Sequence, residues 1–148
     1  MVDKEGIIFY YTEHHNNTEK LLKDSVDERF VLEKVPSNVI DVSQYKYIGF
    51  ASGVYWGDFG KALNEHIVKL KGVEGKKCFS VCTSGSGNDS YIEIPKGMIK
   101  KLKGNFVGGF VCKGFDTYGQ FGKMGGIAHG HPNEEDAENC KKFLATLN

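Results

Sequence analysis

The sequence predicts an α/β protein with a doubly wound, five-stranded parallel sheet and helices on both faces. Two observations carry this prediction. Five short apolar runs recur along the chain, and segments with one apolar stripe at helical spacing lie between them. Strands that alternate with helices form parallel sheets, and such strands are apolar throughout because both faces of the sheet are covered.

The five apolar runs have the length and composition of buried strands. The first, at residues 7–11, is continuous and apolar, as expected for a strand buried on both faces. The other four are rich in aromatic and β-branched residues, which favour strands. We expect them at residues 30–32, 47–52, 77–83 and 106–112.

Four segments are predicted to be helices from the spacing of their apolar residues. They are residues 18–23, 58–71 and 94–103, and a last helix that follows Asn133. Asn133 is the predicted N-cap, because three acidic residues follow it where the helix dipole favours anions. The predicted inward-facing residues are Leu21 and Leu22; Ala62, Leu63, Ile67 and Leu70; Met98, Ile99 and Leu102; and Ala137, Cys140, Phe143, Leu144 and Leu147.

Length and composition predict one ordered domain over residues 1–148. The chain is 40% hydrophobic and 12% aromatic, a composition that argues against disorder. No apolar run approaches the roughly 20 residues that a membrane span needs. The apolar stretch at residues 6–11 is too short for a secretion signal. We therefore expect a cytoplasmic protein with no membrane partner.

The charges argue against a nucleic-acid partner. Nineteen basic and nineteen acidic side chains cancel, and Arg29 is the only arginine. Nucleic-acid binders usually carry a basic surplus and use arginines for phosphate and guanine contacts.

The cysteines and histidines are not predicted to bind a metal. Cys78, Cys82, Cys112 and Cys140 are expected to be small buried hydrophobic residues. His129 and His131 lie beside Glu134, but a turn into the last helix explains this grouping better than a metal site.

Polar or glycine-rich loops follow three of the predicted strands, at residues 12–18, 53–58 and 84–91. A fourth segment, residues 113–132, is long and has no regular period. In an open parallel sheet, ligands bind beyond the carboxyl ends of the strands. The P-loop motif of nucleotide hydrolases and the glycine fingerprint of dinucleotide-binding proteins are both absent.

The first loop is a candidate phosphate site, because it leads from a strand directly to a helix N-terminus. Its backbone N–H groups and short polar side chains can surround a phosphate, although the same residues also favour a simple capping turn. The candidate residues are Thr12, His14, His15, Asn16, Asn17 and Thr18.

The second and third loops are a candidate surface for a planar ring. The second holds two large aromatic residues between glycines, and the third combines glycines, polar groups and one more aromatic residue. The candidate residues are Ser52, Gly53, Val54, Tyr55, Trp56 and Gly57 in the second loop, and Thr83, Ser84, Gly85, Ser86, Gly87, Asn88 and Tyr91 in the third.

With these loops, the chain resembles flavodoxin over essentially its whole length. Asp116-Thr117-Tyr118-Gly119 and Gly130-His131-Pro132-Asn133 add to the resemblance. It implies the strand order 2-1-3-4-5, non-covalent FMN, and electron transfer between redox partner proteins. It also implies that the first loop holds the phosphate and the other two hold the isoalloxazine ring, with no catalytic residue and no metal.

Two alternatives remain open from the sequence. The first is an FMN-dependent reductase that takes hydride from NAD(P)H and reduces a quinone or a similar small acceptor, with residues 113–132 forming part of a substrate pocket. The second is an interaction module that kept the fold without the flavin, because a fold does not fix a function.

Overall fold

The computed structural model describes residues 4–12, 16–114 and 126–147 of the 148-residue chain. Its strands are β1 (Gly6–Tyr11), β2 (Phe30–Lys34), β3 (Tyr47–Gly53), β4 (Lys77–Ser84) and β5 (Asn105–Lys113). Its helices are α1 (Asn17–Ser25), α2 (Lys61–Ile67), a short 3₁₀ helix η1 (Asp89–Glu93), α3 (Lys96–Lys101) and α5 (Glu134–Ala145).

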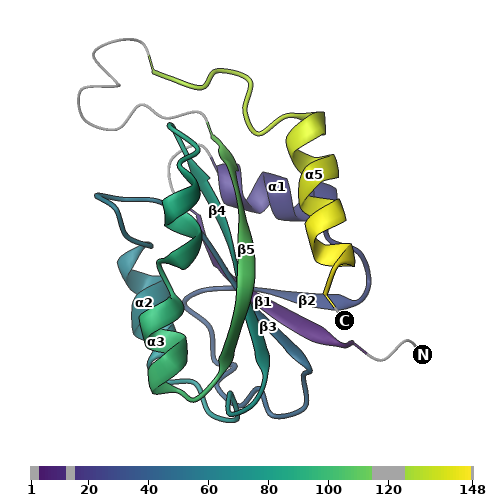
Figure 1. Ribbon diagram of the computed structural model, residues 1–148, viewed down its shortest axis with the longest axis vertical. Helices are drawn as coiled ribbons and strands as arrows, with labels where there is room; N and C mark the ends of the chain where they lie inside the picture. The colour runs from purple at the N-terminus through teal and green to yellow at the C-terminus, as the bar shows by residue number, and fades with distance from the viewer. Residues whose placement is uncertain (1–3, 13–15, 115–125, 148) are drawn as a thin grey trace.

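The five strands form one parallel sheet in the order β2-β1-β3-β4-β5 (Figure 1). Both the fold class and the strand order expected from the sequence are confirmed. All five predicted strands are present within two residues of their expected bounds. Among the described residues, no helix has the length and apolar character that crossing a membrane requires.

The helices cover both faces of the sheet, with α1 and α5 on one side and α2 and α3 on the other (Figure 1). Successive residues of a strand point to opposite faces. In β1, Ile7 and Phe9 therefore join the core cluster that includes α2 and α3, whereas Ile8 and Tyr10 join the one that includes α1 and α5. This alternation explains why β1 is apolar at almost every position.

Two predicted helices are shorter in the structure. The helix expected at residues 58–71 is α2, which starts only at Lys61 because Asp58 is paired with Tyr55 in the preceding turn. It ends at Ile67 because the N–H groups of Lys69 and Leu70 bond to carbonyls three residues back, which tightens the last turn.

The helix expected at residues 94–103 is the shorter α3, which ends at Lys101. The 3₁₀ helix η1 ends just before it, and α3 begins at Lys96 with Pro95 as its N-cap. Proline lacks the N–H that a helix interior needs, so it stands at the boundary rather than within the helix.

Asn133 is confirmed as the N-cap of α5. Its side chain accepts a hydrogen bond from the backbone N–H of Asp136 at 2.9 Å, and the Asp136 carboxylate accepts one from the Asn133 N–H at 2.8 Å. This reciprocal pair is a capping box, which satisfies two N–H groups that the helix itself cannot bond.

All four cysteines are buried and free, as the sequence predicts. Burial raises the pKa of the Cys78 and Cys82 thiols to about 12 and that of Cys140 to about 11. Because the thiolate is the reactive form, these cysteines serve as packing residues at neutral pH.

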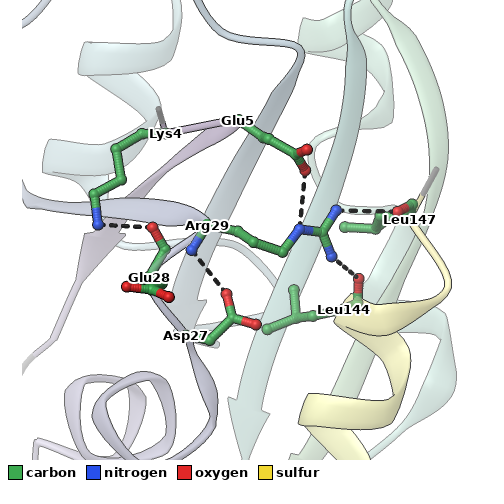
Figure 2. A network of polar contacts seen from close by, with 7 residues as sticks. All are labelled: Lys4, Glu5, Asp27, Glu28, Arg29, Leu144 and Leu147. Atoms are coloured by element: carbon green, nitrogen blue, oxygen red, sulfur yellow. Dashed lines mark hydrogen bonds and ion pairs between the residues drawn. The ribbon is translucent and has the colours of Figure 1, made fainter. Parts of the chain in front are cut away.

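Arg29 links the start of the sheet to the end of α5 (Figure 2). Its guanidinium donates to Glu5 Oε2 at 2.9 Å and to the carbonyl oxygens of Leu147 at 3.2 Å and Leu144 at 3.4 Å. The same group lies 5.3 Å from the ring centroid of Phe30. The planar guanidinium thus adds donors to two carbonyls at the end of α5, of which the Leu144 carbonyl also accepts from the Leu147 N–H at 3.2 Å.

We expect Arg29→Ala to lower the free energy of unfolding by about 1–2 kcal/mol, because the ion pair is partly exposed but the Leu144 and Leu147 carbonyls each lose the bond from Arg29. Arg29→Lys should recover less than half of the loss, since an ammonium group cannot reproduce the planar arrangement of N–H donors in a guanidinium. Urea unfolding of the three proteins measures both values. Full recovery by lysine would show that charge alone matters at this position.

Candidate functional site

The loops predicted to form the site lie together at the carboxyl ends of the strands. The hydroxyl groups of Thr18 at the start of α1 and Thr83 in β4 are hydrogen-bonded at 3.1 Å. The Val54 N–H donates to the Thr83 carbonyl at 3.1 Å, which joins the loops after β3 and β4. The Gly114 N–H donates to the Ser84 carbonyl at 2.8 Å, which adds the end of β5.

The first loop places a buried hydroxyl where β1 ends. The Thr12 Oγ1 atom is buried and, among the described residues, has no hydrogen-bond partner. Asn16 has a left-handed backbone (φ 55°) and Asn17 begins α1. His14 and His15, which were also candidates, lie outside the described residues. A buried hydroxyl without a partner is costly, so Thr12 marks a position where a ligand acceptor would be stabilising.

Gly114 brings the end of β5 against the start of α1. A Cβ atom at Gly114 would lie 2.7 Å from Nδ2 of Asn17, so a larger residue would require the Asn17 side chain to shift. No sequence pattern predicts this contact, because Gly114 is one of several glycines in the long 113–132 segment.

The second loop contains a tight turn that places its two aromatic side chains in different environments. Tyr55 and Asp58 exchange backbone hydrogen bonds of 2.7 and 3.1 Å, and both residues between them, Trp56 and Gly57, have positive φ. These features define a type I′ turn. The turn leaves the Trp56 side chain exposed, with 85% of its surface accessible.

Tyr55, by contrast, packs back onto the loop. Its ring meets that of Tyr11 edge-on at 5.9 Å, and a Cβ atom at Gly53 would lie 2.8 Å from its hydroxyl. The Ser52 hydroxyl, which is buried, accepts from the Gly60 N–H at 3.1 Å and closes the base of the loop. Gly60 is a site-supporting residue that the sequence did not single out.

The third loop is organised by its own polar side chains. Ser84 Oγ accepts from the Gly87 N–H at 2.8 Å, and Asn88 Oδ1 accepts from the Ser90 N–H at 2.9 Å. These bonds shape the Gly85–Ser86 tip and start η1. Tyr91 is half-buried and packs against the core cluster that includes α2 and α3. Of the three candidate aromatic residues, Trp56 is therefore the one that is largely exposed.

Tyr10 ties the first turn of α1 to the sheet. Its hydroxyl donates to Glu19 Oε1 at 3.0 Å. Burial, and then the neighbouring Glu19 carboxylate, raise the pKa of Tyr10 to about 12. The same hydrogen bond, followed by Lys23, lowers the pKa of Glu19.

We expect the Tyr10 contribution to stability to disappear at alkaline pH. The folded pKa of Tyr10 lies above that of the unfolded chain, about 10, so the contribution is complete below pH 10 and falls as pH approaches 12. By pH 11.5 the wild type should have lost about 2 kcal/mol more than Tyr10→Phe. Urea unfolding at pH 9 and pH 11.5 measures this difference. Equal losses in the two proteins would contradict it.

The Thr18–Thr83 hydrogen bond predicts strong coupling between the two positions. Both side chains are buried, so Thr18→Val alone should lower the free energy of unfolding by about 1–3 kcal/mol by leaving the Thr83 hydroxyl without its partner. The double variant Thr18→Val/Thr83→Val should be nearly as stable as wild type. A double-mutant cycle in urea measures the coupling, and additive losses would rule it out.

Within the part of the chain that the structure describes, no group of three or more His, Cys, Asp or Glu residues could hold a metal ion. His131 instead bonds through Nδ1 to Asp136 Oδ2 at 2.7 Å. The described side chains at the strand ends are mainly hydroxyl, amide and aromatic groups, which suit an organic ligand.

No family model matches the chain. A protein of Methanocaldococcus jannaschii named uncharacterized protein MJ0298 is 32% identical over an alignment of 149 positions, which covers 97% of this chain and 97% of MJ0298. The chain belongs to the MJ0298 family.

Comparison with solved structures shows that the fold of the present chain is flavodoxin-like. General stress protein 14 of Treponema denticola, in complex with FMN, has a TM-score of 0.67 and 15% identity over 97% of this chain and 99% of its own. An NADPH-quinone reductase of P. pentosaceus has a TM-score of 0.68 and 11% identity over 97% and 99%. A Fusobacterium nucleatum flavodoxin bound to FMN has a TM-score of 0.58 and 12% identity over 96% of each chain. At these identities the likeness is one of fold.

Proposed function

We propose that the strand-end site binds FMN and that the protein carries electrons between redox partner proteins. The observation that carries this proposal is the buried Thr12 hydroxyl, which has no partner among the described residues and directly follows β1, in the segment that leads to α1. Two proteins of the same fold are in complex with FMN, which supports the choice of ligand.

The phosphate group would lie at the start of α1. The Thr12 hydroxyl would donate to a phosphate oxygen, and the first N–H groups of α1 would donate to others. The helix dipole favours an anion there. Thr18 is already bonded to Thr83, so its role is to hold α1 against β4.

The isoalloxazine ring would lie against the loops after β3 and β4. Trp56 offers an exposed aromatic face, and the Gly57 and Gly87 backbones carry no side chain that would keep a ring away. When bound, FMN supplies the redox chemistry by accepting and donating electrons. The residues of this chain bind it, orient it and exclude water from one face.

A comparison of FMN with riboflavin tests the phosphate site. Both have the same ring, but only FMN has the phosphate. We expect the flavin-free protein to bind FMN at least about 100-fold more tightly, since several charge-assisted hydrogen bonds depend on the phosphate. Fluorescence titration measures both Kd values. Equal Kd values would contradict a phosphate site at Thr12.

The second candidate function is FMN-dependent reduction of a quinone or a similar small acceptor by NAD(P)H. It is favoured by the likeness to an NADPH-quinone reductase and by the zero net charge, which gives no overall attraction to a basic partner protein. NADPH oxidation by the FMN-loaded protein distinguishes the two candidates. A rate no faster than that of free FMN supports the carrier, and a rate at least about tenfold faster supports the reductase.

A further inference from the structure

A cleft of about 350 Å³ lies beside the strand-end site. One wall is the end of β5, including Phe110 and Lys113, and the other is the start of α5 and the segment before it, including Asp136 and His131. Gly87, from the loop after β4, also lines it and so connects the cleft to the proposed flavin site. β5 is the last strand in the sheet order, so this side of it carries no further strand of the described sheet.

The hydrogen bonds of Asp136 determine which nitrogen of His131 carries a proton. The Asp136 carboxylate accepts from the Asn133 N–H at 2.8 Å and lies 2.7 Å from His131 Nδ1. Because an ionised carboxylate only accepts hydrogen bonds, Nδ1 is the donor, and in a neutral imidazole Nε2 is then an acceptor. His131, which lines the cleft, therefore carries a hydrogen-bond acceptor at Nε2.

The other walls indicate which ligand would suit this acceptor. Phe110 is half-buried and offers apolar ring surface, so an aromatic or aliphatic body is favoured. Lys113 disfavours a cation, and the carboxylates of Glu135 and Asp136 disfavour an anion. What remains is a neutral molecule with an apolar ring and a hydrogen-bond donor.

We propose that this cleft binds a hydroxylated aromatic molecule, whose hydroxyl group donates to Nε2 of His131 while its ring lies against Phe110. Asp136 is the positioning residue that fixes the imidazole. The cleft adjoins the flavin-binding surface and shares Gly87 with it, but His131 and Phe110 are not residues of the proposed flavin site.

The competing explanation is that the His131–Asp136 pair only stabilises the entry to α5. Asp136 already belongs to the capping box with Asn133, and Lys20 in α1 donates to the Pro132 carbonyl at 3.2 Å, so this corner is held from two sides. A purely structural role would give the cleft no preference for a donor group. The experiment must therefore compare two ligands that differ only in that donor.

The test uses 1-naphthol and 1-methoxynaphthalene with the full-length, flavin-free protein at pH 7.5. The two compounds share the ring, but only naphthol can donate to His131. We expect equilibrium dialysis to show about tenfold tighter binding of naphthol. His131→Phe keeps a planar ring without Nε2 and should abolish the preference. His129→Phe, at an exposed residue that does not line the cleft, is the matched control and should keep it.

A measurement on the wild-type protein tests the proposal even if the His131→Phe variant fails to fold. Naphthol should shift the ¹⁵N resonance of His131 Nε2 more than methoxynaphthalene does. Equal binding of the two compounds, or no naphthol binding below about 1 mM, would overturn the proposal. Because no flavin is present, either result leaves the FMN proposal unaffected.

Discussion

We expect Thr12→Val to weaken FMN binding about 10- to 100-fold without destabilising the flavin-free protein. Valine has nearly the shape of threonine but no hydroxyl. In the flavin-free protein the Thr12 hydroxyl is buried with no partner among the described residues, so its removal should leave the free energy of unfolding unchanged or raise it by up to about 1 kcal/mol. With FMN bound, the same change removes a charge-assisted hydrogen bond to phosphate.

The opposite signs of these two effects make Thr12→Val informative. Urea unfolding of the flavin-free protein gives the first effect, and fluorescence titration with FMN gives the second. Thr146→Val is the matched control, since the Thr146 hydroxyl is exposed and donates to the Phe143 carbonyl at the far end of α5. A Thr12→Val protein that binds FMN as tightly as wild type would exclude Thr12 from the phosphate site.

Trp56→Ala should weaken FMN binding by a similar factor. An aromatic side chain stacked on a flat ring contributes about 1–3 kcal/mol, as measured for nucleic-acid bases, which is about 5- to 150-fold in Kd. The side chain is 85% exposed, so its loss should change the free energy of unfolding of the protein without added FMN by less than about 0.5 kcal/mol. Titration and urea unfolding measure the two quantities.

Tyr55→Phe is the control for this prediction. It keeps the ring that packs on Tyr11 and removes only a hydroxyl, so FMN affinity should change less than about threefold. Trp56 is the only tryptophan, so FMN binding should also quench the tryptophan fluorescence. Unchanged fluorescence on binding, together with wild-type affinity of Trp56→Ala, would place the ring elsewhere.

The sequence predicted the sheet well because buried parallel strands are apolar on both faces. The run at residues 7–11 illustrates this, since alternate side chains serve two separate core clusters. Helix bounds were predicted less well. The start of α2 depends on the pairing of Asp58 with Tyr55, and helical periodicity contains no signal for that turn.

The sequence could also predict which loops lie together at the strand ends but not the contacts of each side chain. Thr12 and Thr18 are both threonines of one loop, yet only Thr18 is bonded to Thr83, which lies 65 residues away in the chain. Tyr55 and Trp56 are adjacent, yet positive φ at Trp56 and at Gly57 turns one ring inward and leaves the other exposed. Such differences depend on tertiary contacts and backbone angles that composition does not encode.

The most direct test of the flavin proposal is an absorption spectrum of the purified protein after incubation with excess FMN and gel filtration. We expect flavin absorption bands to elute with the protein at about one flavin per chain, because the phosphate and ring sites act together. Protein that elutes without flavin, while its circular dichroism shows a folded α/β structure, would contradict the proposal that this chain binds FMN.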